Sequence, residues 1–143
     1  EETTRFYRDM FGYKPETGAS FVVDKPFTDA AGVPGAQYRK STALITGSNL
    51  LMEFFEYRGI DRTPMKAEIH DPGVAIMRLA VEDISASLTG LKAAGVPIVN
   101  WSGERTIQIA FWFAMGRDPN NFFFQLQQPF QPPNAQRGNP PAR

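Results

Sequence analysis

The sequence predicts an α+β fold built from two similar halves, each with one helix followed by about three strands. The first observation is an internal repeat. Residues 47–55 (GSNLLMEFF) match residues 119–127 (PNNFFFQLQ), so Glu53 corresponds to Gln125, 72 residues later. The second is a pair of glycines at predicted helix ends, Gly12 and Gly95, which lie 83 residues apart. The difference of 11 residues between the two spacings corresponds to a longer loop in the first half, near residues 15–35. The third is the strand-like alternation of apolar and polar residues after each helix. Such self-similarity indicates a duplicated structural unit.

The first helix is predicted over residues 2–11. Acidic residues lead the segment, Phe6 and Met10 repeat at a spacing of four, and Gly12 follows where a helix commonly ends. A strand matching the one that opens the second half is expected before this helix, and it is missing from this chain.

The rest of the first half is predicted as two strands preceded by a long loop. Residues 15–35 are rich in Pro, Gly, Asp and Ala. Within them, residues 21–23 (FVV) are a short strand candidate, and residues 25–35 suit a mobile lid. Strands are predicted over 38–46 and 50–57, joined by a Gly-Ser-Asn turn.

The second half is predicted as a strand, a helix and three further strands. A strand over 75–83 leads into a helix whose apolar residues recur at i, i+4 and i+7 from Ile84, and Gly95 ends it. The further strands are predicted over 96–100, 106–115 and 122–128.

These elements divide the chain into two modules and a tail. We expect a first module over residues 1–58, a linker loop over 59–73 and a second module over 74–129. The remaining residues, 130–143, are expected to form a flexible Pro-rich tail. A chain of 143 residues fits one compact domain or two small halves that share a core.

Composition restricts the classes of binding partner and the kinds of reactive site that this chain can have. Fifteen basic and fifteen acidic residues give no net charge, which disfavours nucleic acid or an anionic membrane as partner and leaves small molecules. The absence of cysteine excludes disulfides, thiolate metal sites and a cysteine nucleophile. No apolar run reaches the roughly 20 residues that a membrane span needs. We expect a cytoplasmic protein.

Five short segments together resemble the vicinal oxygen chelate superfamily, which includes glyoxalase I, methylmalonyl-CoA epimerase, extradiol dioxygenases and bleomycin-resistance proteins. The segments are FYRDMFGY (6–13), LLMEFFEY (50–57), VED (81–83), LKAAGV (91–96) and RDP (117–119). The resemblance covers residues 1–129. It implies two tandem βαβββ modules that form a curved mixed sheet around a cavity, with the first strand of module 1 absent here.

The resemblance also implies a cavity site with an altered set of metal ligands. Metal-using members take a His or similar residue from the first strand of each module and a Glu from the last. On that pattern Glu53 is retained, whereas Ile76 and Gln125 occupy the two ligand positions of the second module. Isoleucine cannot coordinate a metal, and a neutral amide is a poor substitute for carboxylate. We therefore expect no cofactor, with a divalent metal as the alternative. We interpret Gln125 as an uncharged residue in the wall of the cavity that can form hydrogen bonds.

Strand alternation adds Arg78, which shares a face with Ile76. One hypothesis gives Arg78 the electrostatic role of the missing metal, because a guanidinium holds a carboxylate or a substrate oxyanion bidentately. The alternatives are a structural ion pair and an Arg78 that faces solvent.

Glu53 and several aromatic residues complete the candidate site. Glu53 is a candidate general base in an apolar surround, or a vestigial acid paired with Arg78. Aromatic side chains on strands line an apolar pocket, or else belong to the core or a dimer interface. The aromatic candidates are Tyr38, Phe55, Tyr57, Trp112 and Phe123. The one histidine, His70, lies in a loop where solvent exposure is the ordinary outcome.

The leading functional interpretation is a metal-independent lyase or isomerase that acts on an apolar, oxygen-bearing small molecule. Glu53 would take a proton beside a carbonyl, while Arg78 and Gln125 stabilise the oxyanion. The alternative is a non-catalytic protein that binds small molecules of the antibiotic type, and a third is a metal-dependent glyoxalase or dioxygenase. The resemblance also implies a homodimer.

Overall fold

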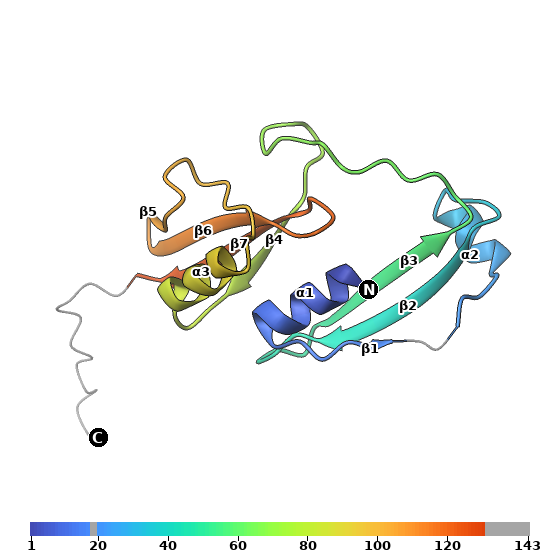
Figure 1. Ribbon diagram of the computed structural model, residues 1–143, viewed down its shortest axis with the longest axis horizontal. Helices are drawn as coiled ribbons and strands as arrows, with labels where there is room; N and C mark the ends of the chain where they lie inside the picture. The colour runs from blue at the N-terminus through green and yellow to red at the C-terminus, as the bar shows by residue number, and fades with distance from the viewer. Residues whose placement is uncertain (18–19, 131–143) are drawn as a thin grey trace, which may run out of the picture. The chain divides into compact units, whose positions relative to one another are not determined.

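The computed structural model describes residues 1–17 and 20–130 and shows an α+β fold with two compact units (Figure 1). The first unit comprises Glu1–Asp71 and Asp118–Phe122, and the second comprises Pro72–Arg117 and the residues that follow Phe122. Each unit has its own β-sheet. The tail predicted beyond Phe130 lies outside the described residues. Within the described part of the chain, no helix is long and apolar enough to cross a membrane.

The first unit contains a three-stranded antiparallel sheet and two helices. Helix α1 (Glu2–Phe11) agrees with the predicted helix, and it ends at Gly12, whose positive φ of 68° suits glycine. The sheet order is β1–β2–β3. The strands are β1 (Glu16–Thr17), β2 (Gln37–Leu44) and β3 (Leu51–Arg58).

A short helix, α2 (Lys25–Ala30), occupies part of the segment predicted as a loop, so the prediction was wrong for these six residues. The Asp24 side chain caps α2 by accepting a hydrogen bond from the backbone N–H of Phe27 at 3.0 Å. Pro26 lies in the first turn, where a helix needs no N–H donor. These two residues start a helix in a segment that has no apolar periodicity.

The second unit contains a four-stranded mixed sheet in the order β4–β7–β6–β5. Strands β4 and β7 are parallel, and the other pairs are antiparallel. Helix α3 contributes Ile84, Leu88 and Leu91 to the core, which are the apolar positions that predicted it. The elements are β4 (Ile76–Ala80), α3 (Ile84–Ala93), β5 (Thr106–Gln108), β6 (Phe111–Arg117) and β7 (Phe123–Pro129).

Two predicted strands are reduced to single bridges. Residues 21–23 form only the bridge between Val22 and Tyr38, and residues 96–100 form only the bridge between Ile98 and Gly116. Short apolar runs of this kind fit a strand by composition alone, whereas the pairing found at each run is limited to one bridge. The two predictions were therefore wrong in extent.

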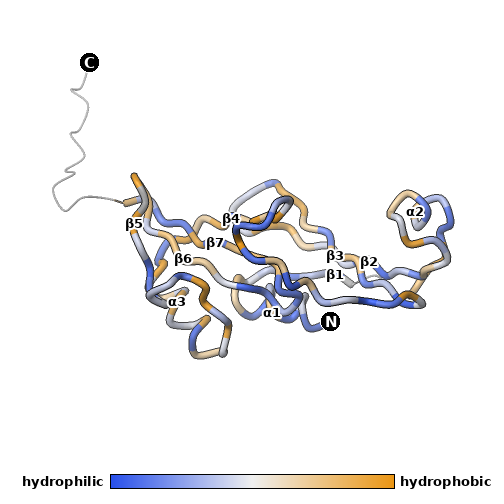
Figure 2. The backbone as a smooth tube through the Cα atoms, turned by 90° about the horizontal axis from the view of Figure 1, so that it is seen from above, coloured by the Kyte–Doolittle hydropathy of each residue, from blue (hydrophilic) through white to orange (hydrophobic). Residues whose placement is uncertain are grey.

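The strand predicted over 106–115 is divided into β5 and β6. Ile109 has a φ of 55°, which no strand accommodates, and the chain reverses so that Gln108 pairs with Phe111. The Ile109 side chain is 97% exposed, and hydrophobic colouring marks the tube around β5 in Figure 2. A β-branched residue in this conformation gives no turn signal in the sequence, which is why the division was missed.

Strand alternation fixes the direction of Glu53. The neighbouring Phe54 contacts helix α1 through Tyr7, with the two ring centroids 5.3 Å apart. Because successive strand residues point to opposite faces, Glu53 points away from α1. Glu53 is the third residue of β3, and Gln125 is the third residue of β7, so the repeat alignment agrees with the structure.

The same argument fixes the direction of Gln125 in the second unit. The side chain of Gln128 accepts a hydrogen bond from the backbone N–H of Ile84, at the start of α3, at 3.0 Å. Gln125 lies three residues earlier and therefore points to the opposite face, away from α3. In both modules, the equivalent position faces away from the helix of its own unit.

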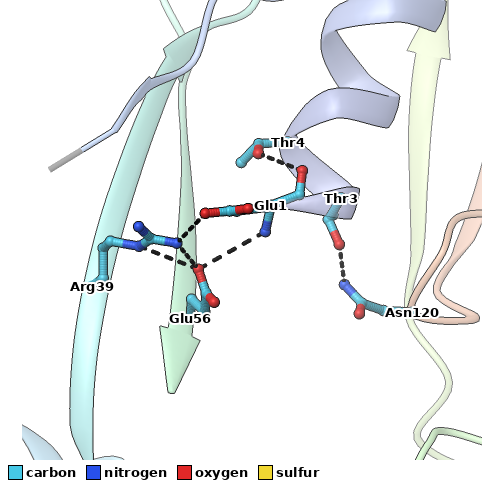
Figure 3. A network of polar contacts seen from close by, with 6 residues as sticks. All are labelled: Glu1, Thr3, Thr4, Arg39, Glu56 and Asn120. Atoms are coloured by element: carbon cyan, nitrogen blue, oxygen red, sulfur yellow. Dashed lines mark hydrogen bonds and ion pairs between the residues drawn. The ribbon is translucent and has the colours of Figure 1, made fainter. Parts of the chain in front are cut away.

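Polar contacts hold the start of α1 in the first unit (Figure 3). Arg39 of β2 donates hydrogen bonds to Glu56 of β3 and, at 3.2 Å, to Glu1. Asn120 Nδ2 donates to Thr3 Oγ1 at 2.7 Å. The first turn of α1 is thus attached both to the sheet and to the 118–122 turn.

Asp118 builds that turn from a buried position. Its Oδ1 accepts hydrogen bonds from the backbone N–H groups of Asn120 and Phe122 at 2.8 and 2.9 Å, and its Oδ2 accepts from the Tyr7 hydroxyl at 3.2 Å. Burial raises the pKa of Asp118, and these three donors oppose the rise. Burial and the adjacent Asp118 carboxylate raise the pKa of Tyr7. Because both of its oxygens accept hydrogen bonds, the Asp118 carboxylate stabilises the turn and attaches it to α1.

Replacing Asp118 with alanine should lower the free energy of unfolding by about 2 kcal/mol, because two backbone N–H groups and the Tyr7 hydroxyl lose their acceptor. The variant Asp118→Asn keeps Oδ1 as acceptor for both N–H groups and should lose less than half as much. Urea unfolding followed by circular dichroism measures both variants. Equal losses would show that the charge, rather than the acceptor geometry, stabilises the turn.

Candidate functional site

The sheet face of the first unit that points away from α1 gathers most of the predicted site residues. The β2–β3 register pairs Tyr38 with Tyr57 and Lys40 with Phe55, and Glu53 lies two residues before Phe55 on β3. Directly opposed residues of antiparallel strands point to the same face. The structure therefore brings Glu53, Phe55, Tyr57 and Tyr38 together on one face.

Phe27 of α2 adds a fourth ring. Its ring centroid lies 4.4 Å from that of Tyr38 and 5.2 Å from that of Phe55. Tyr57 lies 6.3 Å from both Tyr38 and Phe55, and these separations are those of interacting aromatic pairs. Phe55 is 36% exposed and the other three side chains are partly exposed. We call Phe27, Tyr38, Phe55 and Tyr57 the aromatic face.

Glu53 has an ion-pair partner, Lys40, that was not among the predicted site residues. Lys40 Nζ lies 2.7 Å from Glu53 Oε1, and the two side chains are 46% and 39% exposed. The hydrogen bond and the charge of Glu53 raise the pKa of Lys40. Glu53 thus has a cationic partner on its own sheet, in place of the apolar surround expected for a general base.

In the second unit, the face away from α3 carries Ile76, Arg78, Phe123 and Gln125. The parallel β4–β7 register pairs Ile76 with Phe123 and Arg78 with Gln125. Arg78 is exposed and forms no ion pair with the described residues. Exposure was one of the alternatives for Arg78, and its proposed part in holding an oxyanion stays a prediction.

Gln125 is buried to 4% exposure, and its amide has no hydrogen-bonding partner among the described residues. No fully covered side-chain nitrogen or oxygen in the described part of the chain lacks a partner. The small exposed part of Gln125 therefore includes its amide. A buried glutamine whose amide reaches the surface can hydrogen-bond a ligand at little cost to the fold.

Two predicted binding residues do not offer ring surface beside Gln125. Phe123 is 1% exposed, with the Arg117 guanidinium 4.1 Å from its ring centroid. Trp112 lies three residues before Met115, the β6 partner of Gln125, so it points to the other sheet face. There it contacts the guanidinium of Arg105 at 4.2 Å. The sequence could not place Trp112 because its face depends on the β6–β7 register.

Phe27 and Lys40 were not predicted as site residues from the sequence. The signal for Phe27 was the helix start made by Asp24 and Pro26, an N-cap residue followed by a first-turn proline. The signal for Lys40 was its position two residues after Tyr38, which places both on one strand face. His70 is exposed in its loop.

The ligand positions implied by the resemblance do not fit a metal. Ile76 has no donor atom, Gln125 offers a neutral amide, and the Glu53 carboxylate is already paired with an ammonium group. Among the residues that the structure describes, no three His, Cys, Asp or Glu side chains are grouped to hold a metal ion. Function without a metal or other cofactor stays a prediction.

The comparison with known families agrees with this architecture. The model of the Glyoxalase/Bleomycin resistance protein/Dioxygenase superfamily matches residues 1–126. The chain therefore belongs to this superfamily, as the sequence motifs indicated. A search of curated protein sequences found no significant match.

Several solved structures share the fold at low sequence identity. The glyoxylase/bleomycin resistance protein/dioxygenase domain from Frankia sp. EAN1pec is 15% identical, with a TM-score of 0.64 over 91% of this chain and 83% of that chain. The fosfomycin resistance protein FosX from Listeria monocytogenes is 13% identical, with a TM-score of 0.58 over 90% and 83%. The antibiotic binding protein TnmS3 from Streptomyces sp. CB03234 is 18% identical, with a TM-score of 0.55 over 90% and 85%. These similarities show the fold alone.

Replacing Gln125 with methionine, which has a similar shape, should leave the free energy of unfolding unchanged or raise it by about 1 kcal/mol, because the amide has no protein partner to lose. Urea unfolding measures the change. A loss of stability well beyond about 1 kcal/mol would show that the amide takes part in a structural hydrogen-bond network.

Proposed function

We propose that this protein binds an apolar, oxygen-bearing small molecule on the aromatic face of its first module, without converting it. The observation that carries the proposal is the gathering of four partly exposed aromatic side chains on one sheet face. A cluster that served only the core would be buried, like Phe123 and Phe124. Exposed ring surface of this kind stacks with a flat apolar ligand.

The Lys40–Glu53 pair supplies polar contacts beside the rings. An ammonium group has three N–H donors, and Lys40 gives one of them to Glu53. Two donors remain for oxygen atoms of a ligand that lies against Phe55, which is opposite Lys40 in the register. A carboxylate held in this way is a fixed acceptor for a hydrogen bond from a ligand.

The structural relatives are consistent with this use of the fold. TnmS3 is described as an antibiotic binding protein, and FosX as a fosfomycin resistance protein. At 18% and 13% identity, they support the capacity of the fold for antibiotic-type ligands and leave the ligand of this chain open.

Metal-independent lyase or isomerase chemistry is the second candidate, and the position of Lys40 next to Glu53 favours it. Glu53 would take a proton from the carbon beside a carbonyl, and the Lys40 ammonium would stabilise the oxyanion that results. Arg78 and Gln125 are paired on neighbouring strands of the second unit. Their part in such a reaction stays a prediction.

The variant Phe55→Leu should weaken binding of 2-naphthylmethanol, a flat ring with one hydroxyl group, by about threefold to tenfold, because stacking is lost while apolar area is largely kept. Isothermal titration calorimetry measures the Kd. Trp112→Leu, an aromatic change in the other unit, is the matched control and should bind the probe as wild type does.

Equal binding by wild type and Phe55→Leu would contradict the proposed site. The variant Glu53→Gln separates the two candidate functions. A binding protein still binds the probe in this variant, because glutamine keeps an acceptor oxygen, and its wild type shows no turnover of ring-bearing carbonyl compounds. Turnover by wild type that disappears in Glu53→Gln would establish the lyase or isomerase instead.

We also propose a homodimer. Strand β3 is at the edge of its sheet for eight residues, and Leu50 and Leu51 at its start are 65% and 59% exposed. A long edge strand with apolar residues tends to be covered by another chain. Sedimentation velocity should show twice the monomer mass at micromolar concentration, and Leu51→Lys should shift the protein toward the monomer. A monomer at all concentrations would refute this.

A further inference from the structure

Resting on the proposed binding at the aromatic face, we propose that the ligand is an organic cation, an apolar body carrying a protonated or quaternary amine. The recognising groups are the faces of the four rings and the carboxylate of Asp24. Asp24 belongs to none of the site positions that the sequence or the superfamily pattern indicated.

The rings favour a cation over a neutral or anionic group. The face of an aromatic ring carries negative potential, and a cation within about 6 Å of the centroid is attracted to it. Four rings with neighbouring centroids 4.4 to 6.3 Å apart bring several such ring faces into one area. Because these side chains are partly exposed, a ligand can reach them from solvent.

The charges around the aromatic face also favour a cationic ligand. Lys40 is paired with Glu53, and Lys25 is paired with Asp29. Asp24 has no cationic partner among the described residues. The aromatic face is therefore bordered by two neutralised pairs and one unneutralised carboxylate, and an anionic ligand would be repelled there.

Asp24 is oriented toward the rings. Its Oδ1 accepts the hydrogen bond from the Phe27 N–H at 3.0 Å, and its Oδ2 lies 3.5 Å from the Tyr38 hydroxyl, which donates to it. A carboxylate has about four acceptor positions, so capacity remains for an ammonium group.

Capping of α2 does not account for the charge of Asp24. Asparagine is as good an N-cap residue as aspartate, because the cap needs one acceptor oxygen and no charge. The substitution Asp24→Asn therefore separates the two roles, since it keeps the cap and removes the carboxylate.

Three probes that share one ring system test the class of ligand: 2-naphthylmethylammonium, 2-naphthylmethanol and 2-naphthoate. Isothermal titration calorimetry at neutral pH and low salt gives the three Kd values. Wild type should bind the ammonium about fivefold to thirtyfold more tightly than the alcohol, the range expected from cation–π and ion-pair contributions. The naphthoate should bind most weakly.

The variant Asp24→Asn should remove most of the preference for the ammonium over the alcohol. Asp9→Asn is the matched control, because it removes a carboxylate from α1, on the other face of the same sheet, and should keep the preference. Thermal unfolding of both variants checks that the fold is intact. An unchanged preference in Asp24→Asn, or tighter binding of naphthoate than of the alcohol, would overturn the inference.

Failure of the inference and failure of the proposed function give different results. If the alcohol binds and Phe55→Leu weakens it, the aromatic face is a binding site whatever the charge preference. If none of the probes binds, or if Phe55→Leu changes none of the Kd values, the proposed function is wrong and the cation preference is refuted with it.

Discussion

A β-strand has two faces, and in both modules one of them is covered by the helix of the same unit. In β3, Phe54 packs against Tyr7 of α1, so Glu53, Phe55 and Tyr57 lie on the face of the sheet that points away from the helix. A register shift of one residue would exchange the two sets. The packing of Phe54 on α1 is therefore the constraint on which the aromatic face and its ion pair depend.

The buried Asp118 supports this constraint from an unexpected part of the chain. The turn 118–122 follows a strand of the second unit, yet it clusters with the first, where Asp118 accepts from the Tyr7 hydroxyl. A carboxylate is costly to bury unless its oxygens are satisfied, and here both are. Tyr7 is thereby fixed at the hydroxyl end by Asp118 and at its ring by Phe54.

The sequence could predict the duplicated fold, because periodicity, glycine helix ends and the repeat are all local signals. It could also place Glu53 and Gln125, whose equivalence follows from the repeat alone. It could not pair Glu53 with Lys40, because that contact depends on the β2–β3 register. Helix α2 was missed because six residues are too few to show a helical period, and its signal is confined to its start, where Asp24 caps the helix and Pro26 lies in the first turn.

The altered ligand positions and the aromatic face have one electrostatic explanation. A transition-metal site needs several unneutralised donors that converge, and the first module instead neutralises its carboxylate with Lys40 on the same face. An ammonium group beside Glu53 opposes a divalent cation but leaves the neighbouring rings and Asp24 available. Rings and one carboxylate suit an organic cation better than a divalent metal ion, because an organic cation with a single charge is less strongly hydrated and can place its apolar body against an aromatic face. The side chains that weaken the face as a metal site are therefore compatible with its use as a site for an organic ligand.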